Sequence, residues 1–276
     1  MNVWIEAARP RTLTIAISPV LVGTASAEEP IVWRFGAALI VALAIQIGVN
    51  FANDYSDGRR GVDTPARVGP RRATAAGLVT PEAMKVAVVA ALAVAAGAGL
   101  ALAAATSYVL VAVGALCFIA TLAYSGGPRP YASVGLGEVF VFVFFGLVAT
   151  AGSAYVQTER ITLMAVFSAI PVGLLATAVL VVNNLRDMNT DAAVGKLTLA
   201  VRIGKTRTIS LYRGLVLGSY PWLVLVAGGL GTAWPLLSFA SLPFALRQMR
   251  TASSLSGTAR LQLGFSVLLA SGLWLS

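Results

Sequence analysis

Long runs of apolar residues recur along the whole chain, separated by shorter polar stretches. Their lengths are close to the roughly 20 residues that an α-helix needs to cross the hydrocarbon core of a bilayer. The pattern predicts an all-α integral membrane protein with about nine transmembrane helices embedded in the lipid bilayer. The predicted helices cover residues 12–27, 33–53, 84–106, 107–126, 134–155, 161–185, 209–229, 232–248 and 258–275.

Two polar segments interrupt this pattern at equivalent places. Residues 53–82 follow the second predicted helix and residues 183–208 follow the sixth, so their starts lie 183 − 53 = 130 residues apart. Each segment comes after the second helix of a four-helix group. We therefore expect a single domain, residues 1–276, built from two pseudo-repeated four-helix units plus a ninth helix around a central cavity. Transporters also use internal repeats, so the duplication alone does not select a function.

The basic residues predict the orientation in the membrane. With a cytoplasmic N-terminus, only Arg34 and Arg160 of the 20 Lys and Arg residues lie outside, which leaves 20 − 2 = 18 inside. The opposite orientation would break the positive-inside rule. The N-terminus and both polar segments are thus predicted to be cytoplasmic. The same rule accounts for the net charge of +9, so nucleic acid is not expected as a partner.

Composition narrows the class of protein and its metal chemistry. Hydrophobic residues make up 58% of the chain and charged residues 11%, against roughly a quarter charged in soluble domains. No removable signal peptide is expected at the start. The chain has no histidine and a single cysteine, Cys117, so a metal would need oxygen ligands, which favours Mg²⁺. Arg outnumbers Lys 17 to 3, which fits a high-GC bacterial genome and a bacterial plasma membrane.

The first polar segment carries a stripe of acids and amides. At 3.6 residues per turn, one face of the second helix presents Asn50, Asn53, Asp54 and Asp57. Glycines at 58 and 61 then let the chain turn, so Asp63 can fold back toward that stripe. An Asp-rich helix end of this kind is, taken alone, most often just solvated.

The second polar segment repeats the arrangement. Asn183, Asp187 and Asp191 are spaced i, i+4, i+8 and again share one face of a helix. Each half of the chain therefore delivers an Asn-x-x-x-Asp ladder at the same predicted membrane depth. Two matching ladders in equivalent positions are much harder to explain by solvation than either one alone.

Facing ladders would form an anionic oxygen cage whose carboxylates repel one another unless cations neutralise them. Mg²⁺ binds a few carboxylates and keeps substrate phosphates among its other ligands. The predicted metal ligands are Asn53, Asp54, Asp57, Asp63, Asn183, Asp187 and Asp191, and the catalytic acids are Asp57, Asp63, Asp187 and Asp191. Nearby basic residues are predicted to bind a diphosphate: Arg11, Arg67, Arg72, Lys196 and Arg202. The positive-inside rule is the competing explanation of these basic residues.

Aromatic residues gather around the fourth and fifth predicted helices. Most such residues pack or face lipid, but some could line a prenyl-chain groove or face a developing carbocation. Tyr124, Phe145 and the acid Glu138 are the candidates for contact with the prenyl chain or its acceptor. Glu138 lies near the cytoplasmic start of the fifth helix, where an acid is either functional or simply hydrated.

At the two Asp motifs the sequence resembles the UbiA superfamily of membrane prenyltransferases, over nearly the whole chain. It is most similar to the branch that prenylates 1,4-dihydroxy-2-naphthoate in menaquinone biosynthesis. The closer resemblance lies in four stretches, at residues 8–13, 53–70, 124–146 and 183–200. Two features depart from other branches: Asp57 and Asp63 are six residues apart, and Pro128 stands where many relatives carry the lysine of a Tyr-x-x-x-Lys element. Arg129 is therefore not assigned the role of that lysine.

The resemblance implies a Mg²⁺-dependent reaction. Asn53, Asp57, Asp63, Asn183, Asp187 and Asp191 would hold Mg²⁺, which would bind a polyprenyl diphosphate donor. Transfer to the naphthoate ring with loss of CO₂ and diphosphate would give demethylmenaquinone. The ring position, the decarboxylation and the product are implied by the resemblance, whereas the spacing of residues indicates only metal and diphosphate.

Two other functions remain open from the sequence. A UbiA-type enzyme with another aromatic acceptor, such as 4-hydroxybenzoate, is the nearest alternative. A cation-coupled transporter is the alternative from another class, but transporters hold their acids at helix breaks near the midplane. Here the acids cluster at one membrane face.

Overall fold

The structure is a computed structural model that describes residues 2–61, 69, 71–250 and 254–276. In these residues it contains helices and no strands, as the sequence predicts. The α-helices are α1 (Val3–Ala8), α2 (Thr14–Ala25), α3 (Val32–Arg59), α4 (Pro81–Ala105), α5 (Val109–Ala123), α6 (Gly137–Val141), α7 (Ala149–Thr158), α8 (Leu163–Ala193), α9 (Leu199–Gly218), α10 (Pro221–Leu230), α11 (Leu242–Arg250) and α12 (Leu255–Trp274). Short 3₁₀ segments lie at Pro10–Thr12, Tyr131–Val134 and Trp234–Ser241, and a π-helical segment, Phe142–Val148, joins α6 to α7.

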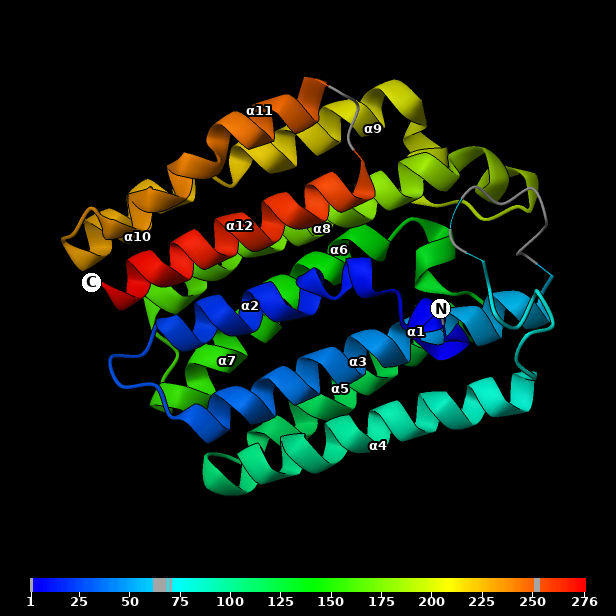
Figure 1. Ribbon diagram of the computed structural model, residues 1–276, viewed down its shortest axis with the longest axis horizontal. Coiled ribbons are helices and arrows are strands. Elements are labelled where there is room, and N and C mark those ends of the chain that lie inside the picture. Colours follow the sequence, from blue (N-terminus) through cyan, green and yellow to red (C-terminus); the bar gives the residue numbers. More distant parts are fainter. Residues whose placement is uncertain (1, 62–68, 70, 251–253) are drawn as a thin grey trace.

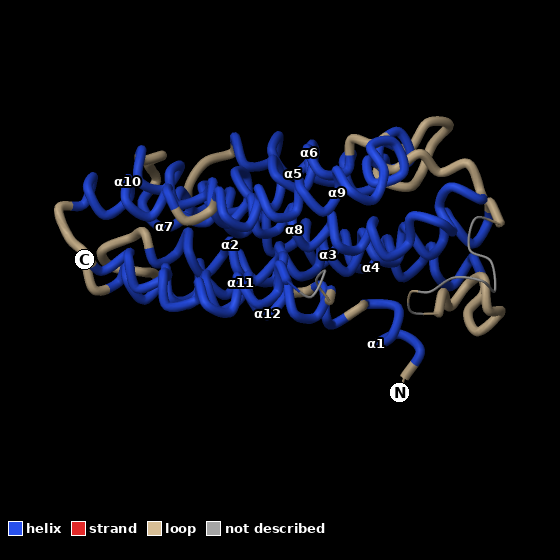
Figure 2. The backbone as a smooth tube through the Cα atoms, turned by 90° about the horizontal axis from the view of Figure 1, so that it is seen from above, coloured by secondary structure: helices blue, strands red, loops and turns tan. Residues whose placement is uncertain are grey.

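The long helices run side by side as one bundle (Figures 1 and 2). In the described chain, five helical stretches are long and apolar enough to cross a membrane: Val32–Arg59, Pro81–Ala105, Gly137–Thr158, Leu163–Ala193 and Leu199–Leu230. Thr14–Ala25 and Val109–Ala123 are shorter apolar helices. The all-α membrane class is confirmed, whereas the count of nine spans and the two-unit repeat remain predictions.

Helix α8 forms the centre of the bundle. Val172, Leu175 and Val182 are fully or almost fully buried and belong to one core with Tyr212 of α9 and Phe265 of α12. This explains why α8 is apolar on nearly all sides over its membrane-spanning part, as a helix surrounded by other helices must be.

Glycine pairs let helices approach α8 closely. A Cβ on Gly146 would lie 2.5 Å from the Cα of Gly173, so any side chain at residue 146 would force the π-helical segment away from α8. Small residues at helix crossings serve this purpose in membrane bundles. This crossing fixes the segment that carries the aromatic side chains near the candidate site.

Large apolar side chains remain exposed on the outer surface of α4 and α5. Val86 and Val89 on α4 and Val109, Leu116 and Ile119 on α5 are each 58–68% exposed. A soluble monomer rarely shows such a continuous apolar surface, but a helix facing lipid must.

The largest boundary differences from the prediction lie after the sixth predicted helix. The polar stretch after the sixth predicted helix is itself mostly helical, because α8 continues to Ala193, and α9 already begins at Leu199. Charged residues ended the apolar pattern but not the helices, since a helix can extend beyond the hydrocarbon layer into water. Helix α9 is bent at Gly204, whose backbone (φ 78°) favours glycine.

Both acid-bearing helices end in the same way. Gly61 follows α3 with φ 65° and Gly195 follows α8 with φ 73°, so in each case a glycine in the left-handed conformation turns the chain just after the helix. The connections after α3 and α8 both lie at the same end of the bundle, on the right of Figure 1. The two ladders are therefore brought to one end of the molecule.

Candidate active site

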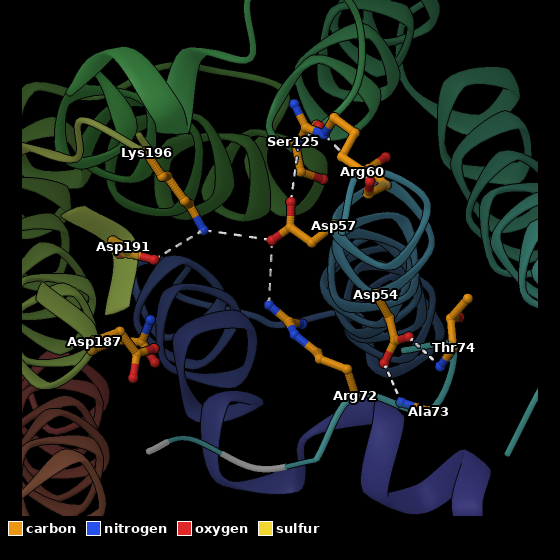
Figure 3. A network of polar contacts seen from close by, with 12 residues as sticks. Asp54, Asp57, Arg60, Arg72, Ala73, Thr74, Ser125, Asp187, Asp191 and Lys196 are labelled. Atoms are coloured by element: carbon orange, nitrogen blue, oxygen red, sulfur yellow. Dashed lines mark hydrogen bonds and ion pairs between the residues drawn. The ribbon is translucent and has the colours of Figure 1, made fainter. Parts of the chain in front are cut away.

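The acids at the C-terminal ends of α3 and α8 lie on either side of Lys196 (Figure 3). Asp57 of α3 is fully buried, and Asp187 and Asp191 of α8 are 3% and 5% exposed. Three carboxylates buried at one end of a membrane bundle are costly unless positive charges accompany them. The basic side chains that neutralise these carboxylates define the site.

Lys196 joins the two ladders. Its Nζ lies 3.5 Å from Oδ2 of Asp57 and 3.7 Å from Oδ1 of Asp191, so one ammonium group contacts a carboxylate from each helix. The turn at Gly195 directs the chain back over the end of α8, where the Lys196 N–H donates to the Asp191 carbonyl oxygen at 2.9 Å. A cation at this point would also attract the phosphate groups of a ligand.

Asp57 receives positive charge from three different parts of the chain. Besides Lys196, Arg60 donates from Nη2 to Oδ1 at 2.9 Å, and Arg72 brings its Nη2 to 3.6 Å from Oδ2. Asn53 lies on the same face of α3. With its amide oxygen toward Arg72 (3.2 Å), its amide nitrogen donates to Asp57 Oδ2 at 2.6 Å.

Asp187 has a local partner instead. The neighbouring Arg186 donates from Nε to Oδ1 and from Nη2 to Oδ2, both at 2.7 Å, in a two-point contact. The same Nη2 also donates to Oδ1 of Asn183 at 2.9 Å. Arg186 thus contacts the side-chain oxygens of Asn183 and Asp187.

Asp54 makes different contacts from those of Asp57. Both of its oxygens accept backbone N–H groups, from Ala73 at 2.9 Å and from Thr74 at 2.8 Å. Figure 3 shows Asp54 turned toward this segment, while Asp57 points to Lys196. The physical reason is helical geometry, since at about 100° per residue Asp54 lies about 60° around α3 from Asp57, on the side away from Asn53. Asp54 therefore contacts the Ala73–Thr74 backbone and does not face Lys196, and its predicted metal binding stays a prediction.

Four other predicted residues are not placed between the carboxylates. Asp63 and Arg67 lie outside the described residues. Arg11 is exposed at the end of the first 3₁₀ segment. Arg202 is exposed and donates from Nε to the Leu197 carbonyl oxygen at 3.1 Å, so it stabilises the loop that carries Lys196.

The predicted site residues do not include three participants. Arg60 and Arg186 directly contact the acids, yet the sequence signals only their adjacency to Asp57 and Asp187. Arg9 lines the cavity described next and has a left-handed backbone (φ 53°), which is unusual for arginine and enforces the turn before Pro10. Only that Arg-Pro junction marked it in the sequence.

An apolar cavity of about 430 Å³ opens beside the ladders. Asn53 and Asn183 line it at the ladders, and its walls come from α2–α5, the π-helical segment, α7 and α8. Small residues widen it, among them Ala38, Ala95, Gly99, Gly114 and Gly152. The predicted central cavity is present, and its apolar walls suit a hydrocarbon chain.

Aromatic rings form a row along one wall. Tyr131 stacks on Phe140 with 3.9 Å between ring centroids, Tyr124 meets Tyr131 edge-on at 5.4 Å, and Phe144 follows Phe140 at 5.9 Å. Tyr124 and Phe145 both line the cavity, in agreement with their predicted place. Burial, and then the neighbouring Tyr124, raise the pKa of Tyr131, which keeps its hydroxyl protonated as a neutral hydrogen-bond donor.

Glu138 has a different setting. It is 6% exposed and its Oε1 accepts a hydrogen bond from Nδ2 of Asn184 at 3.0 Å. The described cavity lining does not include it. Glu138 therefore connects α6 to α8, next to Asn183, and its predicted contact with the acceptor stays a prediction.

The donor chemistry at the helix ends fits Mg²⁺. Asp57, Asp187 and Asp191 together with Asn53 and Asn183 offer only hard oxygen ligands, which suit this ion. Within the described residues no three acids converge on one point, and Arg60, Arg186 and Lys196 pair with Asp57 and Asp187. A bound Mg²⁺ would replace contacts that these cations now make.

Comparison with known proteins agrees with this picture. Residues 16–267 match the UbiA prenyltransferase family. The chain is 45% identical over 249 residues to the 1,4-dihydroxy-2-naphthoate octaprenyltransferase of Mycobacterium tuberculosis, covering 88% of this chain and 84% of that protein. It is 38% identical over 259 residues to the enzyme of the same name from Escherichia coli, covering 90% and 83%.

Solved structures show the same fold. A UbiA homolog from Archaeoglobus fulgidus bound to GPP and Mg²⁺ superposes with a TM-score of 0.73 at 14% identity, over 99% of both chains. One from Aeropyrum pernix K1, in its apo form, gives 0.73 at 14% identity over 96% of this chain and 97% of that one. With a family match over most of its length and close relatives of the same class, the chain belongs to the UbiA prenyltransferase family.

Proposed function

We propose that the protein transfers a polyprenyl group from a polyprenyl diphosphate to 1,4-dihydroxy-2-naphthoate, with loss of CO₂ and diphosphate, in menaquinone biosynthesis. The observation that carries this proposal is the meeting of the Asn53/Asp57 and Asn183/Asp187/Asp191 ladders around Lys196 at the mouth of an apolar cavity. A diphosphate ester with a hydrocarbon tail needs both parts side by side. The names of the most similar curated relatives support the naphthoate acceptor.

The helix ends would bind the diphosphate. Asn53, Asp57, Asn183, Asp187 and Asp191 would hold Mg²⁺, and so would Asp63, which lies outside the described residues. When bound, Mg²⁺ supplies positive charge that stabilises the negative charge growing on the leaving diphosphate. Lys196 and Arg72 contact Asp57 already and would add donors to the phosphate oxygens, which strengthens the same stabilisation.

The cavity would bind the prenyl chain and exclude water. Breaking the allylic C–O bond sends its electron pair to the diphosphate and leaves a carbocation that water would quench, so a dry pocket is essential. The faces of Tyr131 and Phe140 lie at this wall and attract positive charge.

The acceptor ring would complete the transfer. A ring carbon attacks the cation and forms the new C–C bond, and the electron pair of the C–CO₂ bond returns to the ring as CO₂ leaves. A carboxylic acid also releases its proton. No electrons leave the ring, so the product is demethylmenaquinone at the hydroquinone oxidation level.

The location follows from the charge pattern and the apolar surface. We place the enzyme in a bacterial plasma membrane, with the N-terminus and the connections after α3 and α8 in the cytoplasm. Both water-soluble naphthoate and released diphosphate would then enter and leave on the cytoplasmic side.

The deciding experiment is product formation by the purified protein in detergent or lipid. It would receive a polyprenyl diphosphate and 1,4-dihydroxy-2-naphthoate, with Mg²⁺ or with EDTA, and products would be identified by mass spectrometry. We expect a prenylated, decarboxylated ring only with Mg²⁺. Prenylation of 4-hydroxybenzoate instead would retain the reaction class and overturn the acceptor. Folded protein that transfers no prenyl group to either acceptor would overturn the proposal.

A further inference from the structure

Asp54 is the acid of the first motif that the reaction scheme leaves unused. It is 1% exposed, and each of its oxygens accepts one backbone N–H, from the consecutive residues Ala73 and Thr74. Hydrogen bonds from fixed backbone N–H donors to a carboxylate are charge-assisted and strong. Asp54 thus binds the backbone of a segment that returns to α3 about 20 residues later in the chain.

This segment, residues 71–80, is docked on α3 by apolar contacts as well. Ala73 and Val79 are buried in a small core with Phe51 and Ala52 of α3 and Met84 of α4. The segment is internally closed, because the Ala76 N–H donates to the Arg72 carbonyl at 2.9 Å and the Leu78 N–H donates to the Ala73 carbonyl at 2.9 Å.

Gly58 supplies independent support for this docking. A Cβ at residue 58 would lie 3.0 Å from two side-chain carbons of Thr74, closer than ordinary van der Waals contact. Residue 58 must be small for Thr74 to reach its place on the helix. Gly58, one helical turn after Asp54, therefore leaves room for the same segment that Asp54 binds.

The docked segment carries Arg72, which is 4% exposed. Arg72 directly precedes the two clamped residues, and its guanidinium extends to Asp57 (3.6 Å) and to the amide oxygen of Asn53 (3.2 Å). Figure 3 shows Asp54 and Asp57 on different sides of α3, with Arg72 running from the first to the second. A shift of the backbone at residues 73 and 74 would move this guanidinium relative to the site.

We infer that Asp54 is a positioning residue: its carboxylate fixes the Ala73–Thr74 backbone so that Arg72 meets the donor diphosphate beside Asp57. It acts through Arg72 and is not a ligand of Mg²⁺. This inference rests on the proposed function for the identity of the ligand, but the contact itself does not.

The first test separates positioning from metal binding by kinetics. In Asp54→Asn we expect the KM for geranylgeranyl diphosphate to rise about 10-fold, the scale expected when a hydrogen bond to a charged group is lost. The Mg²⁺ concentration for half-maximal rate should change less than about 2-fold, because Asp54 does not bind the metal. In the Arg72→Gln background, Asp54→Asn should raise KM by less than about 3-fold, because residues that act through one another are not additive. The inference would be overturned if the donor KM did not change, or if the Mg²⁺ requirement rose in parallel with KM. It would also be overturned if the effects of Asp54→Asn and Arg72→Gln on KM simply multiplied in the double variant.

A second variant leaves every carboxylate in place. Gly58→Ala pushes on Thr74, so we expect the same rise in donor KM and the same loss of effect in the Arg72→Gln background. Gly36→Ala is its matched control, because residue 36 lies in the same helix and a Cβ there meets nothing within 4 Å. Equal KM values for Gly58→Ala and Gly36→Ala would contradict the inference.

A third measurement needs no activity. Amide hydrogen exchange of peptides covering Ala73 and Thr74 should be at least about 10-fold faster in Asp54→Asn, with exchange in α8 unchanged, since the clamp protects those two N–H groups. If the wild-type protein transfers no prenyl group, the proposed function fails but this result still tests the clamp. Unchanged exchange at residues 73 and 74 in a folded Asp54→Asn protein would overturn the positioning role.

Discussion

The two acidic helix ends look alike in sequence but are completed differently in space. At the end of α3, Asp57 is compensated by cations from its own helix, from the docked segment and from the loop after α8. At the end of α8, Asp187 is compensated by the adjacent Arg186. The first end is assembled from distant parts of the chain, whereas at the second end Asp187 pairs with the residue directly before it. The difference follows from what comes next: a long return segment after α3 and a short turn into α9 after α8.

The two helix ends should therefore respond differently to substitution of their acids. Disturbing Asp57 should affect contacts with three segments at once, while disturbing Asp187 should affect mainly one helix. Four substitutions test this order, and their expected effects decrease from the first to the last.

Asp57→Asn should have the largest effect. It removes the buried charge that faces Arg60, Arg72 and Lys196, and with it a predicted ligand of Mg²⁺. We expect kcat to fall about 10³-fold, the upper range for loss of one preorganised electrostatic contact. The rate of prenylated product at saturating substrates measures it. The rate is compared in protein shown to be folded, because removing one partner of a buried ion pair also destabilises a protein. Retention of more than about a tenth of the activity would contradict the assignment.

Asp187→Asn should reduce kcat about 10²-fold, less than Asp57→Asn, because Arg186 continues to cover Asn183 and the amide oxygen at residue 187. The same assay measures it. Glu82→Gln is the control, since it removes an exposed carboxylate from the start of α4 and should leave the rate unchanged. A fully active Asp187→Asn enzyme would remove the second ladder from the site.

Lys196→Met cuts the link between the two ends. We expect the KM for the polyprenyl diphosphate to rise about 10-fold because a phosphate donor is lost. The Mg²⁺ concentration for half-maximal rate should fall, because the ammonium group no longer competes for Asp57 and Asp191. Titrations of donor and of Mg²⁺ measure the two effects, with the exposed Lys205→Met as control. A higher Mg²⁺ requirement would show that Lys196 supports metal binding instead.

Arg186→Gln should have the smallest effect, a change in kcat of no more than about 3-fold. Its side chain is 24% exposed, and a partly solvated ion pair contributes little. Steady-state rates beside Asp187→Asn measure the difference within one helix end. A loss as large as that of Asp187→Asn would mean that Arg186 itself binds the substrate.

The sequence alone determined the membrane class and the faces of the two helices. Apolar runs of membrane-spanning length leave few alternatives to helices in lipid, and helical periodicity places Asn53 beside Asp57, and Asn183 beside Asp187, whatever surrounds them. These are local consequences of the chain and are present in the structure.

Only the tertiary structure decided which groups meet across elements. Asp54 and Asp57 are equivalent acids in the sequence, but one accepts N–H groups from residues 73 and 74 and the other contacts Lys196, 139 positions away. Helix periodicity predicts the direction in which each side chain leaves the helix axis. It does not predict which other segment of the chain packs against that side chain. The packing of the return segment, helped by a glycine at residue 58, and the turn at Gly195 made that choice.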